Sequence, residues 1–457
     1  MKKASSMTTK VTQRGARVLR RDLAAELPIT AEDVKRVSAR LNEPTPLAEA
    51  RLQAFETYRS LPMPSTKEEA WRRTDIRALP AEAAHSQTAK PEPVEPALLE
   101  PLAADTHGAL LVLRPGLESE RRGEAALGGG MVFSDWATAV REYPGLLEAY
   151  AGGLVEPEAG KFAALAAAMA GDGALLYVPK GMQIKQPLHA IFWAPIDSGA
   201  FFSRLLVVME EGASATLVYE NASPTSPDGG AVHAGLVEVH LGPEAQLKLV
   251  ELQTLGGHVW NFTHERARLD RDARLDWVFG AVGSRLTKSF SDLDLAGEGA
   301  EGRISGFYFT SDRQHLDHDT QQNHLAPQTT SDLLYKGALV DYSRSVWQGM
   351  IYVAPGAQKT DGYQANRNLL LSKHARADSI PGLEILADDV RCTHGATVSQ
   401  IEQEPVYYLM TRGLPRMEAE RVVVDGFFSP IMERIPFEAV RRRFEALIDA
   451  KLGARRA

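Results

Sequence analysis

Small turn pairs that end in alanine recur through the middle of the chain, and they restrict the possible folds more than any other feature. The alanines of the first four pairs lie 32, 28 and 27 residues apart, and the next interval of 57 residues is about two such repeats. A drifting period of this size is typical of a solenoid, in which every coil packs only on its neighbours. The pairs are Gly212-Ala213, Glu244-Ala245, Asp272-Ala273, Gly299-Ala300 and Gly356-Ala357.

Short apolar runs lie between turns of this kind, and their length is typical of buried strands. They predict a mainly β region that is interrupted by one helical stretch over residues 161–170. We favour a β-solenoid over a sandwich or barrel, because those folds would show a turn spacing of about 8–12 residues. The runs cover residues 109–113, 174–178, 205–209, 236–241, 247–252 and 275–279.

Periodicity and composition divide the chain into three regions. Residues 1–105 predict an N-terminal helical domain that ends in a linker rich in proline and acidic residues. Residues 106–397 form the predicted β-solenoid core, and residues 398–457 form a C-terminal helical domain. The last region is too short to bury a core of its own, so we expect it to pack on the β region or on a partner. The helical pattern of the first region rests on Val34, Val37, Leu41, Leu52, Phe55 and Tyr58.

Charge and composition argue against several classes of protein. The 457 residues carry a net charge of −8, which gives no reason to expect a nucleic acid as partner. No apolar run approaches the roughly 18 residues that a membrane helix needs, so no membrane association is expected. A single cysteine excludes a disulfide framework and fits the reducing cytosol, so the expected location is cytoplasmic.

The single cysteine, Cys392, is followed two residues later by His394. On a strand both side chains would point to the same face, where a thiol and an imidazole could form part of a metal or cluster site. Two ligands alone are too few to complete such a site. The structural alternatives are a buried small hydrophobic residue for Cys392 and a hydrogen-bonded core histidine for His394.

Other motifs give weaker indications of function. The G-x-G-x-x-G pattern of residues 297–302 is followed by a strand-like run, so it predicts a turn and not a dinucleotide site. The chain has no P-loop motif, and we expect no ATP site in it. The densest histidine cluster holds His315, His318 and His324, for which a metal site is one interpretation and a hydrogen-bonded turn is favoured.

Two pairs of carboxylates leave an enzymatic alternative open. Asp317 with Asp319, and Asp388 with Asp389, could serve a β-solenoid enzyme that hydrolyses polysaccharides. The β region shows few aromatic residues placed as an evident sugar platform, which counts against this alternative.

Longer motifs resemble those of the SufB/SufD family. The segment DVRCTHGATV at residues 389–398 is similar to the C-terminal signature of that family, and residues 69–75 resemble its N-terminal E-x-W-R-x-T element. The resemblance covers nearly the whole chain. Further similar segments are residues 161–165, 172–173, 177–181, 358–364, 369–371, 407–414, 418–420 and 426–428.

Members of this family help to assemble iron–sulfur clusters. The resemblance therefore implies a right-handed parallel β-helix with helical ends. It also implies two partners: SufB, which would pair through the β-helix, and the ATPase SufC, which would dock on the C-terminal helical domain. A transient iron–sulfur cluster would be shared with SufB, and reduced flavin is a further candidate cofactor of the complex.

Two positions make the chain similar to the SufD branch of the family. The SufB branch carries a cysteine near the position of Asn366 and a glutamate at the position of Gly395, and this chain has neither. It keeps His394, the histidine that the resemblance implies as the SufD contribution to the cluster. His394 is therefore the candidate cluster ligand and Cys392 a weaker one. No catalytic residue is expected, and the chain would act as a scaffold subunit.

The resemblance also indicates where SufC would dock. The helical segment of residues 407–428 lies beyond the β region and is rich in apolar residues, as expected of a helical docking element. A homodimer of the same fold that acts alone remains the alternative function. The candidate SufC contacts are Tyr407, Tyr408, Leu409, Arg412, Gly413, Phe427 and Phe428.

Overall fold

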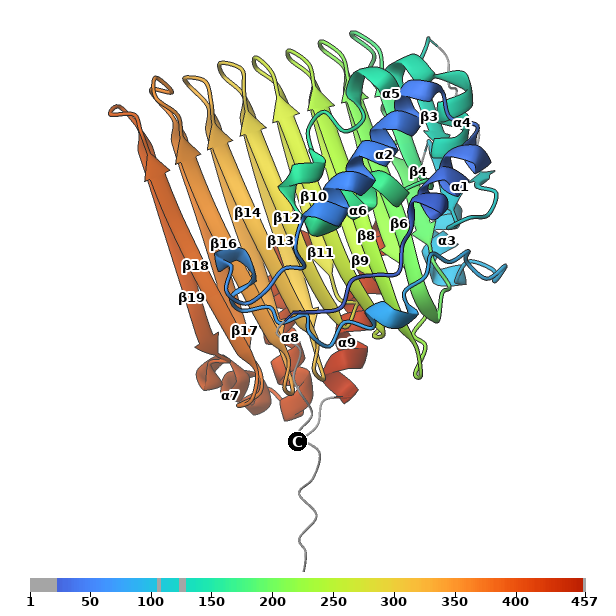
Figure 1. Cartoon of the computed structure of the whole chain (residues 1–457). Coiled ribbons are helices and arrows are strands. Elements are labelled where there is room, and N and C mark those ends of the chain that lie inside the picture. The colour runs from blue at the N-terminus through green and yellow to red at the C-terminus, as the bar shows by residue number, and fades with distance from the viewer. Residues whose placement is uncertain (1–22, 105–107, 123–128, 455–457) are drawn as a thin grey trace, which may run out of the picture.

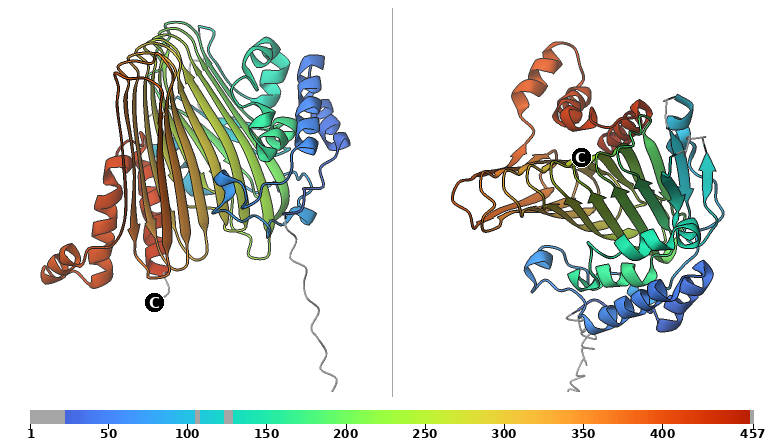
Figure 2. Two further views of the ribbon diagram at one scale, coloured as in Figure 1. Left: turned by 60° about the vertical axis from the view of Figure 1, so that its left-hand side comes forward. Right: turned by 90° about the horizontal axis from the view of Figure 1, so that it is seen from above.

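The computed structural model describes residues 23–104, 108–122 and 129–454, so the first 22 residues of the expected N-terminal domain lie outside the described part. The described chain is a flattened parallel β-solenoid with helices on its two opposite faces (Figure 1; Figure 2, right). This architecture confirms the mainly β solenoid with helical ends that the repeat predicted.

Two sheets, A and B, form the walls of the solenoid. In spatial order, the described strands of sheet A are β18 (Arg376–Ile385), β16 (Arg344–Val353), β14 (His315–His324), β12 (Leu286–Leu295), β10 (Val259–Leu269), β8 (Gly230–Leu241), β6 (Ser198–Met209), β4 (Gly173–Val178) and β3 (Val132–Asp135). Those of sheet B are β19 (Arg391–Gln400), β17 (Asp361–Leu370), β15 (Thr330–Leu339), β13 (Glu301–Thr310), β11 (Arg274–Ala281), β9 (Gln246–Thr254), β7 (Ser214–Ala222), β5 (Leu188–Trp193), β1 (Ala109–Leu113) and β2 (Glu120–Arg122). Consecutive strands from β4 onward alternate between the sheets, so each pair from β4–β5 to β18–β19 forms one coil.

The register between neighbouring coils confirms the predicted period. Trp260 on β10 lies opposite Leu286 on β12. Ser198 on β6 lies opposite Gly230 on β8. In each pair the two residues are one coil apart along the chain, and the two separations bracket the spacing of the first four turn alanines. Coils of slightly different length therefore stack in register, which explains why the interval between turn pairs drifts.

The turn alanines form a column at one corner of the solenoid, directly before the strands of sheet B. The interval of 57 residues before the fifth pair spans one coil in which threonine replaces the turn alanine. Thr329 occupies the position equivalent to Ala300, and Thr360 occupies the same position one coil later. Ala357 lies in the same turn as Thr360 but three residues before the equivalent position. The fifth predicted pair, Gly356-Ala357, therefore lies in the expected turn, but its alanine does not align with the other four. The four earlier alanines are fully buried: Ala213, Ala245, Ala273 and Ala300.

N-terminal helices cover the outer face of sheet A (Figure 1). Helix α1 (Ala31–Leu41) begins with a capping box between Thr30 and Asp33, and α2 (Thr45–Ser60) packs on α6 (Lys161–Met169). Helix α6 is buried along its whole length against the sheet, and the buried ammonium of Lys161 donates to the backbone oxygens of Tyr58 and Leu61 at 2.6 and 2.7 Å. The helices predicted at residues 31–41 and 161–170 are thus confirmed.

C-terminal helices cover the outer face of sheet B. Helices α8 (Arg416–Met432) and α9 (Glu438–Ala454) lie along it, and the ring of Phe307 on β13 packs 6.0 Å from Phe428 and 5.4 Å from Phe444, measured between centroids. This packing confirms that the C-terminal helices use the β region as their core. Helix α7 (Gln403–Thr411) packs on α8 and projects beyond the solenoid (Figure 2, left).

Shorter elements complete the N-terminal end of the solenoid. Helices α4 (Trp136–Glu142) and α5 (Pro144–Tyr150) follow β3, so the prediction of one helical stretch within residues 106–397 was wrong. Helix α3 (Pro96–Ala104), which the sequence did not predict either, packs against α9. Single 3-10 turns lie at Glu69–Trp71, Ala81–Ala83 and Pro157–Ala159. The turn at Glu69–Trp71 packs on β10 and β12 of the middle coils, and the other elements lie nearer the first coils. No described element covers the last coil.

Candidate functional site

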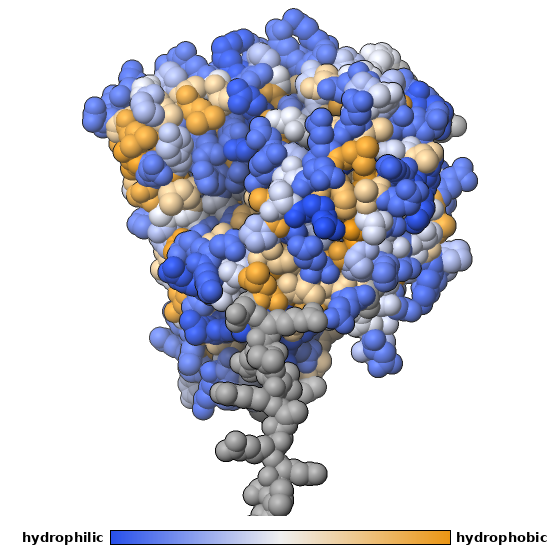
Figure 3. All heavy atoms as spheres, in the orientation of Figure 1, coloured by the Kyte–Doolittle hydropathy of each residue, from blue (hydrophilic) through white to orange (hydrophobic). Residues whose placement is uncertain are grey.

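The last coil of the solenoid, β18–β19, has an open edge. Each of its strands pairs on one side only, β18 with β16 and β19 with β17. The unpaired backbone groups of an edge strand are a ready template for pairing with another chain. Apolar side chains are exposed at the same end, among them Leu383 and Ile385 at 37% and 38%, and Figure 3 shows hydrophobic side chains gathered along this edge, at the left of the view. The open end thus has the features of a protein interface.

His394 and Cys392 lie on β19, in this edge strand. They stand opposite Gln364 and Gly362 of β17, so both face the same side of sheet B, as predicted for a strand. His394 is exposed and Cys392 is half-buried. The imidazole of His394 is therefore accessible at the surface of the described chain, whereas the thiol of Cys392 is partly covered.

The pocket around Cys392 keeps its thiol protonated. Gly362 makes room for the sulfur, because a Cβ atom at that position would lie only 3.2 Å from Sγ. Burial raises the pKa of Cys392 above its ordinary value, and the nearby Asp361 carboxylate adds to this, although a backbone hydrogen bond from Gly362 opposes it. A thiolate is the form that ligates metals and attacks sulfur, so Cys392 is poorly prepared for either role in this state.

A buried polar network lies directly inside the open end. Asn366 on β17 is fully buried, and its Oδ1 accepts hydrogen bonds from Asn368 Nδ2 at 2.6 Å and from Ser379 Oγ. Tyr308 Oη donates to Asn368 Oδ1 at 2.6 Å. Asn366 therefore fixes the packing of the last coils. It has no path to act as a surface ligand in this conformation.

The predicted histidine cluster lies on strand β14 and not in a turn, so the favoured interpretation was wrong. Alternation along the strand sends His315 and Asp317 to the outer face, where Lys288 Nζ lies 3.1 Å from Asp317 Oδ1. Thr74, from the segment before β1, hydrogen-bonds His315 Nε2 at 2.8 Å, while His318 points into the solenoid and bonds Ser289. Burial lowers the pKa of His315 to about 4, so it is neutral at pH 7. The cluster anchors the N-terminal segment on sheet A.

The two carboxylate pairs lie in different environments. Asp317 is 1% exposed beneath Thr74 and is held by Lys288, so no polysaccharide could reach it. Asp388 and Asp389 are exposed neighbours in the turn between β18 and β19. Among the residues that the structure describes, no group of three or more His, Cys, Asp or Glu side chains could hold a metal ion.

The predicted docking residues separate into exposed and buried ones. Tyr407 and Tyr408 on α7 are 69% and 55% exposed. Phe428 is only 2% exposed and packs on Phe307, so it stabilises the C-terminal domain and cannot touch a partner in this conformation. Sequence reasoning missed Met417, which is 55% exposed at the start of α8. The remaining predicted contacts are exposed or partly buried: Leu409, Arg412, Gly413 and Phe427.

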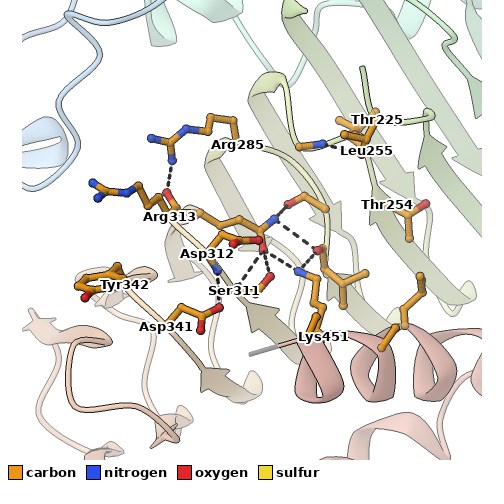
Figure 4. Close-up of a pocket in the computed structure, with 18 residues that line it drawn as sticks. Thr225, Thr254, Leu255, Arg285, Ser311, Asp312, Arg313, Asp341, Tyr342 and Lys451 are labelled. Atoms are coloured by element: carbon orange, nitrogen blue, oxygen red, sulfur yellow. Dashed lines mark hydrogen bonds between the residues drawn. The ribbon is translucent and has the colours of Figure 1, made fainter. Parts of the chain in front are cut away.

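A groove of about 920 Å³ separates α9 from the corner turns of the middle coils (Figure 4). Lys451 of α9 points into the corner and donates to Val282 O at 2.5 Å, Phe309 O at 3.1 Å and Gln314 Oε1 at 2.6 Å. Burial lowers the pKa of Lys451 to about 7, against the attraction of Asp312. The three acceptors all belong to the solenoid, so this lysine fastens α9 to it.

Comparison with known proteins assigns the fold and the motif to one class. Residues 192–427 match the family model described as "SUF system FeS cluster assembly, SufBD core domain", and residues 103–190 match "SufBD protein N-terminal region". The chain therefore belongs to the SufBD family of iron–sulfur cluster assembly proteins.

Within this family the chain is SufD-like. The iron–sulfur cluster assembly protein SufD of Bacillus subtilis is 31% identical over 446 residues, which cover 94% of this chain and 99% of that protein. SufB of the same organism is 29% identical over 312 residues, which cover 68% of this chain and 66% of SufB. A SufBD family protein of Staphylococcus epidermidis is 30% identical over 312 residues, which cover 68% of this chain and 66% of that protein.

In the described residues, no helix is long and apolar enough to cross a bilayer.

Proposed function

We propose that this chain is a non-catalytic scaffold subunit that assembles iron–sulfur clusters at an interface with a SufB-type partner. The observation that carries the proposal is the open last coil, where an exposed histidine lies on a strand whose outer edge is unpaired. Imidazole is a competent ligand to iron, and one ligand needs others to hold a cluster. A partner that pairs with the edge of β18 and β19 would supply those other ligands, so His394 would form half of a shared site.

The partner would join by extending the two sheets. A second β-solenoid with an open edge of its own could pair with the backbone of β18 and β19 and bury Leu383 and Ile385. Cys392 would be a second ligand only if pairing lowered the pKa of its thiol. The reactive cysteine would come from the partner, and the cluster is the product of the complex, with reduced flavin as a candidate cofactor.

The C-terminal helices would dock a SufC-type ATPase. Helix α7 offers Tyr407 and Tyr408 at a projecting surface, and α8 connects this surface to the solenoid through Phe428 and Phe307. A change in SufC geometry on binding ATP would therefore be passed to the β-solenoid as a rigid-body movement. This chain would receive mechanical work without an ATP site of its own.

His394→Ala tests the cluster ligand. We expect the complex with SufB and SufC to form normally, and the iron and sulfide bound after reconstitution to fall several-fold, because one ligand is lost. Thr393→Ala is the matched control, since this exposed neighbour lies on the opposite face of β19. A full cluster yield from the His394 variant would overturn the ligand role.

Tyr407→Ala combined with Tyr408→Ala tests the docking surface. We expect SufC to be lost from the co-purified complex while SufB is retained. The proposed SufC site is on α7, whereas the proposed SufB site is the edge of β18 and β19. Leu325→Ala is the control, since that leucine is 41% exposed and follows β14 at the end of the strands opposite to α7. Undiminished SufC binding by the double variant would contradict this docking site.

A homodimer is the second candidate function, because the same open edge could pair with a second copy. The mass of the purified chain, measured with and without co-expressed SufB, separates the two functions. A stable heteromer in the presence of SufB supports the scaffold role, and a homodimer that persists beside SufB supports independent action.

A further inference from the structure

A small pocket on the outer face of sheet A is not used by the proposed function. It has a volume of about 280 Å³ and lies between α2, α6 and the loop of residues 151–158. Arg204 on β6 lines it from the sheet, and Trp136 at the start of α4 lines it from the side. Both side chains are buried, at 7% and 2% exposure. The pocket is thus built around a buried cation and an indole.

The guanidinium of Arg204 has unused hydrogen-bonding capacity. Its Nη2 atom lies 3.8 Å from Glu238 Oε2, which is too long for a hydrogen bond, and its buried Nε has no partner among the described residues. The guanidinium carbon lies 4.9 Å from the Trp136 ring, a cation–π contact that satisfies no N–H group. Burial lowers the pKa of Arg204, in opposition to the Glu238 charge.

The neighbouring carboxylates are held by other donors. Glu238 accepts backbone N–H groups from Gly152, Leu154 and Val155 at 2.9, 3.0 and 3.2 Å. Glu43 is held by Arg51, whose Nε and Nη2 lie 2.7 to 2.9 Å from its oxygens. Neither acid can turn to Arg204 without breaking these bonds. A buried cation without hydrogen bonds is costly, and native proteins satisfy such groups with water or a ligand.

The donors of Arg204 that remain open to the pocket are its two Nη groups, which form no hydrogen bond within the described chain. Arg204 Nε and Trp136 Nε1 are fully enclosed, so the indole lines the pocket beside the guanidinium without donating into it. A carboxylate could accept from the two Nη groups, with the charge-assisted geometry that guanidinium groups favour. Leu47, Ala54 and Val155 would contact an apolar body attached to it. We propose that this pocket binds a small organic monocarboxylate.

Charge and size favour a monocarboxylate over phosphate or sulfate. Glu158 lies at the rim, where it accepts a hydrogen bond from Thr57 Oγ1 at 3.3 Å, and its charge would repel a dianion. A volume of about 280 Å³ is near the lower end of ligand sites and exceeds what an inorganic anion alone would fill. An apolar acid such as butyrate or benzoate fits both conditions.

Calorimetric titration of the full chain with butyrate and benzoate tests the proposal, with inorganic phosphate and sulfate as comparison ligands. We expect saturable binding of the carboxylates that weakens at least tenfold in Arg204→Gln, because the charged hydrogen bonds are lost. Arg268→Gln on the same face of sheet A should bind as the wild type does, since that arginine is exposed outside the pocket.

A second variant keeps the test decisive if Arg204→Gln fails to fold. Ala50 is exposed on α2 and lines the pocket, so Ala50→Phe fills the entrance and leaves the guanidinium in place. Carboxylate binding should be lost in this variant while its melting temperature stays within a few degrees. Binding that survives Ala50→Phe, absence of saturable binding to the wild type, or equal affinity for phosphate would each overturn the proposal.

Discussion

The first and last coils of the solenoid use the same repeat but differ in what covers them. The first coils are enclosed by N-terminal helices and contain fully buried apolar residues such as Leu217 and Leu249. The last coil has an open edge and exposed apolar side chains, and the coil before it has a polar interior around Asn366. Stability is therefore expected to reside in the covered coils, and interaction with other molecules at the open one. The following predictions test this difference, from the largest expected effect to the smallest.

Leu249→Ala removes a buried side chain from the covered part of the solenoid. We expect the free energy of unfolding to fall by about 2–5 kcal/mol, because the lost apolar burial is accompanied by a cavity. Urea unfolding followed by circular dichroism measures this. The same truncation at the open end, Leu383→Ala, should cost less than about 1 kcal/mol. Equal losses for the two variants would show that the last coil is as tightly packed as the first.

Asn366→Ala removes the centre of the polar network inside the last coils. We expect a loss of about 1–3 kcal/mol, because Ser379 Oγ and one N–H group of Asn368 would lose their acceptor, and Asn368 would keep only its bond to Ser379 Oγ. The shift of the urea midpoint relative to the wild type gives the effect, and Thr393→Ala provides the baseline for an exposed site. An unchanged midpoint would mean that water replaces the network, and that the open end is looser than its hydrogen bonds indicate.

Lys451→Met tests how α9 is fastened to the covered coils. The folded-state pKa of about 7 lies below the ordinary Lys value of 10.5, so the unfolded chain binds more protons between these pH values. Wild-type stability should therefore rise relative to the variant as the pH increases from 7 to 10.5, and the difference should be constant below 7. Thermal unfolding of both proteins across this range measures it. If stability changed with pH in the same way for both proteins, the ammonium group of Lys451 would be better solvated than the structure shows.

Ile385→Lys adds a charge to the open edge and should change stability least, by about 0.5 kcal/mol or less, because the side chain is 38% exposed. Association with SufB should nevertheless weaken clearly, since a lysine on an edge strand opposes strand pairing. Light scattering after size exclusion reports the complex. Leu325→Lys, at a 41% exposed corner position outside the edge, should leave the association unchanged. Identical behaviour of the two variants would place the partner elsewhere.

The sequence predicted those features that depend on neighbours along the chain. The repeat of turn alanines indicated a solenoid because each coil must present the same corner to the next, and the in-register pairing of successive coils confirms it. The helices at residues 31–41 and 161–170, and the placement of Cys392 and His394 on one strand face, followed from local periodicity in the same way.

The tertiary structure decided what depends on segments far apart in sequence. It buried Phe428 against Phe307 and left Tyr407 exposed, although both belong to one apolar helical region. It placed His315 beneath Thr74 as an anchor, and it left Arg204 without a hydrogen bond at its Nε beside a pocket. Burial and hydrogen bonding depend on which surfaces from distant segments pack together. The spacing of residues along one segment does not determine that packing. The sequence alone therefore determined the coil and the family motif, while only the packed chain showed which end of the solenoid is open.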